Sequence, residues 1–206
     1  MKLKDSNTEV KIMEAAKVVF MKYGLYGARM QDIADTAGIN KALLHYYYRN
    51  KEKLFDQVFD GALSKYFEQI DVISDDSMPI KDRILIYIDR MIDFLSEYPQ
   101  MSMFIIKEIS INPDIFKAKV YEIRKGKGAT ILTILEEGKK TGQIPADLDS
   151  VIFMINLHSL CTYPFLASPI FKVISEKSKM NWKDPQNNKL KQSVKDFVTF
   201  KLTIPQ

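Results

Sequence analysis

The side chains best suited to catalysis or metal binding do not form a known motif in this 206-residue chain. His158 and Cys161 lie three residues apart, so one helical face would carry both, as in a metal or thiol sensor. One histidine and one cysteine do not complete a tetrahedral metal site, and the only other histidine is His45. The acidic pairs at 75–76 and 136–137 are adjacent and would diverge on a helix. We therefore expect no enzyme, catalytic residue, metal or cofactor.

A second set of polar side chains follows a glycine turn near the N-terminus and suits contact with nucleic acid. Residues 30–48 have the pattern of two short helices joined at Gly38, which can adopt a left-handed turn. Ala34 is small where the two helices must cross, while Leu44 and Tyr47 are apolar and expected to face inward. The outward residues, whose types contact phosphates and base edges, are Asn40, Lys41, Leu43, His45 and Tyr46. A plain helical hairpin in a core would have the same spacing.

The elements that position these residues are predicted to be helices, because the apolar periodicity is helical nearly everywhere and no strand alternation is convincing. The fold class is therefore all-α. The first helix should bury Ile12, Ala15, Ala16, Val19, Phe20 and Tyr23. Helices are expected at 8–23 (with Ser6 as an alternative start), 30–37, 40–48, 51–73, 80–97, 100–111, 113–142 with a bend near Gly126 and Gly128, 147–166 and 188–203.

Composition and charge narrow the class of protein. The chain is 46% hydrophobic and 27% charged, which is typical of a globular protein, and a single cysteine fits a reducing compartment. No run approaches the ~18 apolar residues of a membrane-spanning helix, so we expect a cytoplasmic protein. Residues 1–55 hold 10 of the 30 basic and 6 of the 26 acidic residues, leaving 20 of each elsewhere. The whole net charge of +4 therefore lies in the segment with the glycine turn.

Residues 27–55, GARMQDIADTAGINKALLHYYYRNKEKLF, resemble the DNA-binding signature of the tetracycline-repressor (TetR) family of bacterial transcriptional regulators. Residues 8–27 resemble the first helix of that family. The resemblance implies a helix-turn-helix DNA-binding domain at 1–50 and a helical effector-binding and dimerisation domain at 51–206. It also implies a homodimer on a pseudo-palindromic, double-stranded DNA operator. The family's regulators are most often repressors that a small-molecule effector releases from DNA.

The resemblance assigns roles to individual residues of the head. Lys41 matches a lysine that contacts phosphate or a base, and Ala42 matches a position where a small side chain allows close approach to DNA. Leu43 could touch a thymine methyl group. His45 and Tyr46 reverse the family's frequent Tyr-His order. The expected DNA-contacting residues are Arg29, Gln31, Asn40, Lys41, Ala42, Leu43, His45, Tyr46 and Lys51.

For the larger domain the resemblance implies two surfaces. Aromatic and methionine side chains could line a pocket for a small apolar or aromatic effector, although each could equally be core. The pocket candidates are Tyr66, Tyr87, Met91, Met103, Phe104, Phe116, Tyr121, Met154 and His158. The last two long helices would form the dimer interface, although each could pack within its own subunit. The candidate contacts are Ile152, Ile155, Ser159, Leu190, Val194, Phe197 and Val198.

One alternative of a different class stays open from the sequence. A helical protein-interaction or membrane-surface module could use the same tyrosine-rich third helix to contact a partner. Such a module would show no sequence preference on DNA, and its binding would depend little on salt. A DNA-binding regulator would show a steep loss of affinity with salt, because phosphate contacts release counterions.

Overall fold

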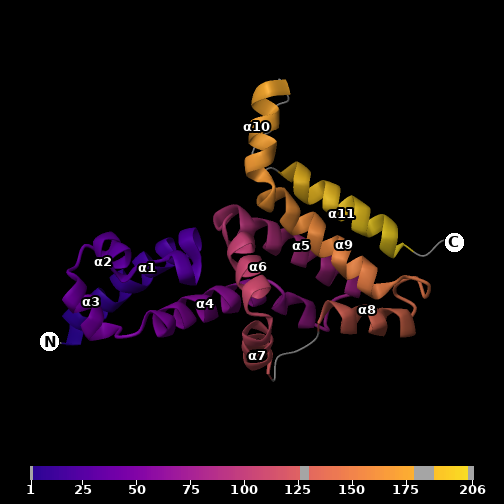
Figure 1. The fold of residues 1–206 in the computed structure, drawn as a ribbon. Helices are drawn as coiled ribbons and strands as arrows, with labels where there is room; N and C mark the ends of the chain where they lie inside the picture. The colour runs from indigo at the N-terminus through magenta and orange to yellow at the C-terminus, as the bar shows by residue number, and fades with distance from the viewer. Residues whose placement is uncertain (1, 126–129, 179–187, 204–206) are drawn as a thin grey trace. The chain divides into compact units, whose positions relative to one another are not determined.

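The computed structural model describes residues 2–125, 130–178 and 188–203, and the elements of regular secondary structure in this part of the chain are all helices. The α-helices, joined in order as Figure 1 shows, are α1 (Lys2–Gly27), α2 (Met30–Ala37), α3 (Lys41–Tyr47), α4 (Lys51–Glu68), α5 (Ile80–Glu97), α6 (Met101–Ile111), α7 (Pro113–Arg124), α8 (Ile131–Lys140), α9 (Ser150–Leu166), α10 (Ser168–Ser178) and α11 (Asn188–Leu202). A 3-10 helix, η1 (Asp71–Ser74), follows α4. The all-α fold class is confirmed.

The chain divides into two compact units. Unit 1 comprises residues 1–65 and 103–123, and unit 2 comprises residues 66–102 and 124–206. The expected boundary at residue 50 stays a prediction about function, since the compact units are defined by packing alone. Helix α4 contributes to both units, with Lys65 in the first and Tyr66 in the second.

Unit 1 is built around an aromatic cluster beside the three N-terminal helices. Helix α1 packs on α2, and α2 packs on α3. The Phe20 and Phe55 rings meet edge to face with centroids 5.1 Å apart, and Phe55 stacks on Phe59 at 5.7 Å. Phe104 of α6 contacts both of these α4 rings at 5.9 and 5.5 Å. Such aromatic pairs add to the free energy of burial, so this cluster fixes α4 against α1 and α6.

Unit 2 has α5 at its centre. This helix contacts η1, α8, α9 and α11, and it buries side chains along most of its length. Figure 1 shows α9 and α11 side by side, in agreement with their contacts. Two ion pairs join α11 to α5, Lys191 with Asp93 at 2.5 Å and Lys195 with Asp89 at 2.6 Å.

Several expected helices differ from the observed ones at their ends. The first helix begins at Lys2, ahead of both expected starts, and its helical path breaks at Gly24, where φ is 70° and ψ is −177°. Tyr23 was expected in the buried stripe and is instead exposed. The expected helix 51–73 ends at Glu68, because residues 71–74 wind into the tighter η1.

The C-terminal half shows two further differences. The segment 113–142 forms two helices, α7 and α8, and the expected bend at Gly126 and Gly128 lies outside the described residues. Helix α10 lies outside the helices expected from the sequence. Pro169 is tolerated in the first turn of α10, where its missing N–H has no intrahelical partner to lose. Pro164 lies inside α9, which continues past it to Leu166.

In the described part of the chain, no single helix is both long and apolar enough to cross a membrane. Helices α9 and α10 reach that length and hydropathy only as a pair, with a bend of 56° between them.

Candidate nucleic-acid interface

The turn between α2 and α3 has the backbone geometry that a helix-turn-helix requires. Gly38 has φ 68° and ψ 34°, in the left-handed region that a residue with a side chain seldom adopts. The Gly38 N–H donates to the Asp35 carbonyl at 3.2 Å, and the Ile39 N–H donates to the Ala34 carbonyl at 3.0 Å. This pair of bonds satisfies the last carbonyls of α2 and redirects the chain into α3.

Helix α3 is held at its start by a cap and along its inner face by packing, and its other face is exposed to solvent. The Asn40 side chain accepts a hydrogen bond from the Leu43 N–H at 2.8 Å, as its N-cap role predicts. Leu44 is fully buried and anchors the helix in unit 1. The exposed residues of α3 are Lys41, Ala42, Leu43, His45 and Tyr46. Tyr46 is 78% exposed, so this surface presents a cation, a small side chain and two hydrogen-bonding rings.

The tyrosines at the end of α3 have different environments. Tyr47 was expected to face inward and is only half-buried, with its ring 5.5 Å from that of Tyr46. The buried tyrosine is Tyr48, because the chain leaves the helix there with φ −134° and ψ 91° and turns this ring back onto α1. The Tyr48 hydroxyl donates to Glu9 at 3.3 Å. Burial, together with this carboxylate, raises the Tyr48 pKa.

The remaining expected DNA-contacting residues flank α3. Arg29 is exposed at the start of α2 and makes no side-chain cap hydrogen bond, and Gln31 donates to Asp35 at 2.7 Å. The Lys51 ammonium donates to the Ala28 carbonyl at 3.1 Å, which fixes the start of α4 to the loop before α2. Lys51 therefore has a structural partner in addition to the phosphate that the resemblance assigns to it.

The expected effector residues divide between the two units. Tyr66, Tyr87, Met91, Met154 and His158 belong to unit 2, whereas Met103, Phe104, Phe116 and Tyr121 belong to unit 1. Phe104 is part of the unit 1 aromatic cluster, and Met103 and Tyr121 are largely exposed. Each group is therefore described within its own unit, and the unit 1 residues stay predictions.

Three of the unit 2 residues form a part-buried polar cluster, in which Tyr87 is buried and Tyr66 and His158 are half-buried. The Tyr66 hydroxyl lies 3.1 Å from His158 Nε2 and 3.2 Å from Nδ1, and the Tyr87 hydroxyl lies 3.4 Å from Nδ1. Burial lowers the His158 pKa, raises the pKa of both tyrosines and raises that of the Cys161 thiol to about 12. The cluster is therefore neutral at physiological pH. It can exchange hydrogen bonds with a ligand or form a polar part of the core.

Some of the expected dimer residues are buried in this structure, and others are exposed. Val194 and Val198 are 3% and 0% exposed and lie inside unit 2, so they are not available to a partner in this structure. Leu190 is half-buried. Ile152, Ile155, Ser159 and Phe197 are exposed on α9 and α11.

Two comparisons of the sequence identify the family. The family model described as "Bacterial regulatory proteins, tetR family" matches residues 12–58, which span α1 to the first half of α4. The HTH-type transcriptional regulator YhgD of Bacillus subtilis (strain 168), which is itself uncharacterized, is 26% identical over 149 residues. That alignment covers 70% of this chain and 76% of YhgD. The N-terminal segment of the chain, residues 12–58, matches the tetR family of bacterial regulatory proteins.

Solved structures share the fold of this tetR-family chain over nearly its whole length. The protein SCO4942 from Streptomyces coelicolor has a TM-score of 0.70 and 20% identity, covering 96% of this chain and 99% of that one. The regulator FadR from Bacillus subtilis, solved in complex with stearoyl-CoA, has a TM-score of 0.63 and 19% identity, covering 95% of this chain and 100% of that one. The chain is a DNA-binding transcriptional regulator, and none of these comparisons supports the alternative of an interaction or membrane-surface module.

Proposed function

We propose that this tetR-family regulator is a cytoplasmic repressor that binds a pseudo-palindromic operator as a homodimer and is released by a small-molecule effector. The observation that carries the proposal is the exposed face of α3, with Lys41, Leu43, His45 and Tyr46 on a helix held by the Asn40 cap and by Leu44. A helix of seven residues extends only about 10 Å and contacts few base pairs, so useful specificity requires two copies.

The DNA-binding surface is tested by substitution within α3. DNA fragments selected from a random pool by the full-length protein supply the operator, and fluorescence anisotropy then measures the affinity of each variant. Lys41→Ala and Tyr46→Ala should each weaken operator binding about tenfold or more, since single base or phosphate contacts contribute about 1–3 kcal/mol. Lys140→Ala, which removes an exposed lysine of α8 in unit 2, is the control and should leave affinity unchanged. Unchanged affinity in both α3 variants would contradict the assignment of α3.

The salt dependence of binding provides a second test of the same surface. Affinity for the selected operator should fall steeply between 50 and 200 mM salt, by about 10³-fold or more if six phosphates are contacted. Lys41→Ala should make this dependence shallower if Lys41 contacts phosphate, and should instead relax base preference if it contacts a base edge. A flat salt dependence would favour a partner other than DNA.

For the effector site we propose the unit 2 cluster of Tyr66, Tyr87 and His158, with Met91 and Met154 as apolar neighbours on the same helices. Tyr66 lies on α4, the helix whose first residue, Lys51, bonds to the Ala28 carbonyl before α2. An effector that displaces the Tyr66 hydroxyl from His158 would therefore act on a helix that also belongs to the DNA-binding unit. The fold neighbour FadR, whose structure contains stearoyl-CoA, supports a ligand of apolar character.

The effector proposal is tested with a panel of small apolar and aromatic compounds, including fatty acyl-CoA. A true effector should raise the thermal unfolding midpoint and lower operator affinity by about 5–150-fold, the range that allosteric coupling usually covers. Tyr66→Phe should reduce this coupling, while Tyr121→Phe, an exposed tyrosine of α7, should not. Transcription from the operator in vitro should be lowest without effector if the protein is a repressor. The opposite response would make it an activator.

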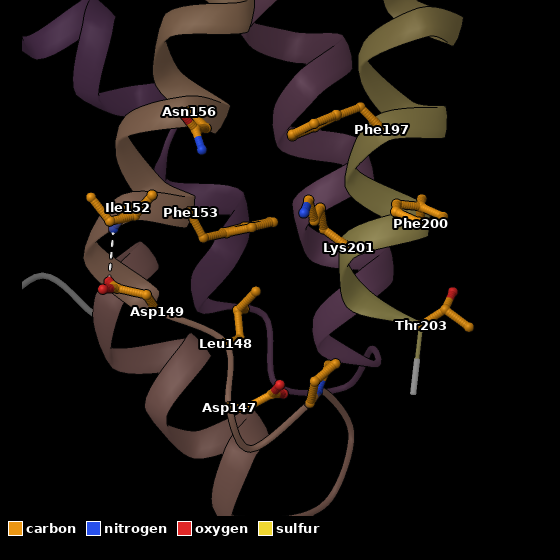
Figure 2. Close-up of a pocket in the computed structure, with 11 residues that line it drawn as sticks. Asp147, Leu148, Asp149, Ile152, Phe153, Asn156, Phe197, Phe200, Lys201 and Thr203 are labelled. Carbon is orange, nitrogen blue, oxygen red and sulfur yellow. Dashed lines mark hydrogen bonds between the residues drawn. The ribbon is translucent and has the colours of Figure 1, made fainter. Parts of the chain in front are cut away.

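The proposed dimer surface is a groove of about 440 Å³ in unit 2, shown in Figure 2. Ile152 and Phe153 line it from α9, and Phe197, Phe200 and Lys201 line it from α11. Ile152 is 53% and Phe200 is 76% exposed, so α9 and α11 present large apolar side chains at the surface. A second copy covering this groove would remove them from water.

A further inference from the structure

A separate cavity of about 160 Å³ lies within unit 1, bounded by the end of α1 and by α4, α6 and α7. Three phenyl rings line it, those of Phe55, Phe59 and Phe116. Its volume is below the ~300–1,000 Å³ of pockets that take drug-sized ligands. It therefore suits a ligand of only a few heavy atoms, and it is distinct from the unit 2 effector cluster.

The cavity wall includes a buried carboxylate that lacks a full set of hydrogen bonds. Glu108 of α6 is 4% exposed, and its Oε1 has no hydrogen-bond partner among the described residues. The carboxylate accepts one hydrogen bond from the Leu25 backbone N–H at the end of α1. A buried acceptor without a partner is costly, more so when it is charged, and a native structure rarely retains one without a reason.

The protein's own cations do not supply the missing donor. Lys119, which also lines the cavity, forms ion pairs with Asp60 at 2.7 Å and with Asp56 at 3.2 Å. Lys107, the residue before Glu108, is exposed and does not line the cavity, and its charge lowers the Glu108 pKa without a hydrogen bond to Oε1. Glu52 adds a further carboxylate to the cavity wall. The carboxylates of Glu52, Asp56 and Glu108 therefore outnumber the single lining ammonium, and that ammonium already has two acidic partners.

We propose that this cavity is a binding site for a small primary alkylammonium ion. One N–H of the ammonium donates to Glu108 Oε1, and the alkyl chain contacts the rings of Phe55, Phe59 and Phe116. The aromatic faces and the excess of carboxylate both favour a cation over a neutral or anionic molecule. The need for an N–H donor selects a primary ammonium over a quaternary one, which has no N–H.

Binding at this site would stabilise the DNA-binding unit. The cavity joins the end of α1, which belongs to the helix-turn-helix packing, to α4, α6 and α7. A cation that bonds to Glu108 adds a contact between these four helices that the protein alone does not make. The ligand would therefore raise the unfolding temperature of the protein, with a stabilisation that grows with the logarithm of the ligand concentration above Kd.

The test is a titration of the full-length protein with n-butylammonium chloride, followed by calorimetry and by amide shifts in two-dimensional NMR. Two probes of similar size are titrated in parallel, namely the neutral n-butanol and tetramethylammonium chloride. We expect n-butylammonium to bind at least about tenfold more tightly than either, because a hydrogen bond to a charged group typically contributes that factor or more. Amide shifts should be confined to cavity residues such as Leu25, Phe55, Glu108, Asn112 and Phe116.

Variants assign the interaction to one carboxylate. Glu108→Gln should weaken n-butylammonium binding about tenfold or more, whereas Glu122→Gln, an exposed glutamate of α7 in the same unit, should have no effect. Equal binding of butanol, equal binding of tetramethylammonium or an unaffected Glu108→Gln variant would overturn the proposal. If Glu108→Gln fails to fold, the amide shifts of the wild-type protein decide, and shifts outside the cavity overturn it. Lys41→Ala should bind the cation normally, so this result is independent of the DNA-binding proposal.

Discussion

At the scale of single residues, His158 is a histidine whose environment favours the neutral ring. Its ring nitrogens face the hydroxyls of Tyr66 and Tyr87, and burial lowers its pKa below the ordinary value of 6.5. At a pH between this lowered pKa and 6.5, the His158 ring binds a proton in the unfolded chain but not in the folded chain. The contribution of His158 to stability is therefore complete above pH 6.5 and decreases as the pH falls below it.

We expect His158→Gln to remove this part of the pH dependence. At pH 8 the variant should be about 1–2 kcal/mol less stable in urea denaturation, because two hydrogen bonds are changed. The difference from wild type should shrink as the pH falls from 6.5. His45→Gln, which changes the exposed histidine of α3, is the control and should follow the wild-type curve. A constant difference between pH 5 and 8 would show that His158 keeps its ordinary pKa.

We expect the opposite pH dependence for Glu108, because burial raises its pKa above the ordinary value of 4.5. The hydrogen bond from the Leu25 backbone N–H and the charge of Lys107 lower the Glu108 pKa, but they offset the effect of burial only in part. Between pH 4.5 and the raised pKa, the folded chain holds a proton that the unfolded chain has released, so stability falls as the pH rises. In the absence of ligand, the Glu108→Gln variant should therefore be more stable than wild type at pH 7 and about as stable as wild type at pH 4. Urea denaturation at both pH values measures this, and an equal effect at the two would contradict a raised pKa.

The sequence predicted some of these residues and not others, for a physical reason. Asn40 and Gly38 act through backbone groups within five residues, so local spacing was enough to assign the N-cap and the left-handed turn. Glu108 gave no sequence signal, because its burial depends on α1, which lies more than eighty positions earlier in the chain. Tyr48 was missed for a similar reason, since its hydroxyl partner is Glu9.

At the scale of elements, helix ends were predicted well where a residue beside them decides the ending. Residues 80–97 form α5 as expected, between Pro79 and Tyr98. The first helix was expected to end at residue 23, and its helical path breaks at the next residue, Gly24, where φ is 70°. The expected end at residue 73 was wrong, because residues 71–74 wind into η1 and bury Val72 and Ile73.

Two glycines allow a matched test of the helix-turn-helix turn. Gly38 has a positive φ and no atom within 4 Å of an added Cβ, so Gly38→Ala should cost about 1–2 kcal/mol through backbone strain alone. Gly61 lies exposed inside α4 with equally open space, so Gly61→Ala should stabilise the protein by up to about 1 kcal/mol. Chemical denaturation measures both. Equal effects of the two substitutions would show that the turn does not require its left-handed residue.

At the scale of the whole molecule, the function depends on whether two copies join through α9 and α11. The groove between these helices exposes Ile152, Phe197 and Phe200, while Val194 and Val198 on the inner side of α11 pack within unit 2. The ion pairs of Lys191 and Lys195 with α5 hold α11 in place within its own unit. The exposed Phe197 and Phe200 of α11, together with Ile152 of α9, therefore form the apolar part of the proposed interface.

We expect a charge placed on this face to prevent dimer formation and, with it, tight operator binding. Ile152→Asp combined with Phe197→Asp would bury two unpaired carboxylates at the interface, which is strongly unfavourable. Analytical ultracentrifugation should then give a monomer of 23.8 kDa in place of a dimer. The double variant should bind a full operator no more tightly than wild type binds a single half-site, since each recognition helix contacts only one half. Val173→Asp, an exposed apolar position on α10, is the control for an added charge elsewhere in unit 2 and should remain dimeric. A double variant that stays dimeric would locate the interface on another surface, whereas a monomer that keeps full operator affinity would show that one copy of α3 is sufficient.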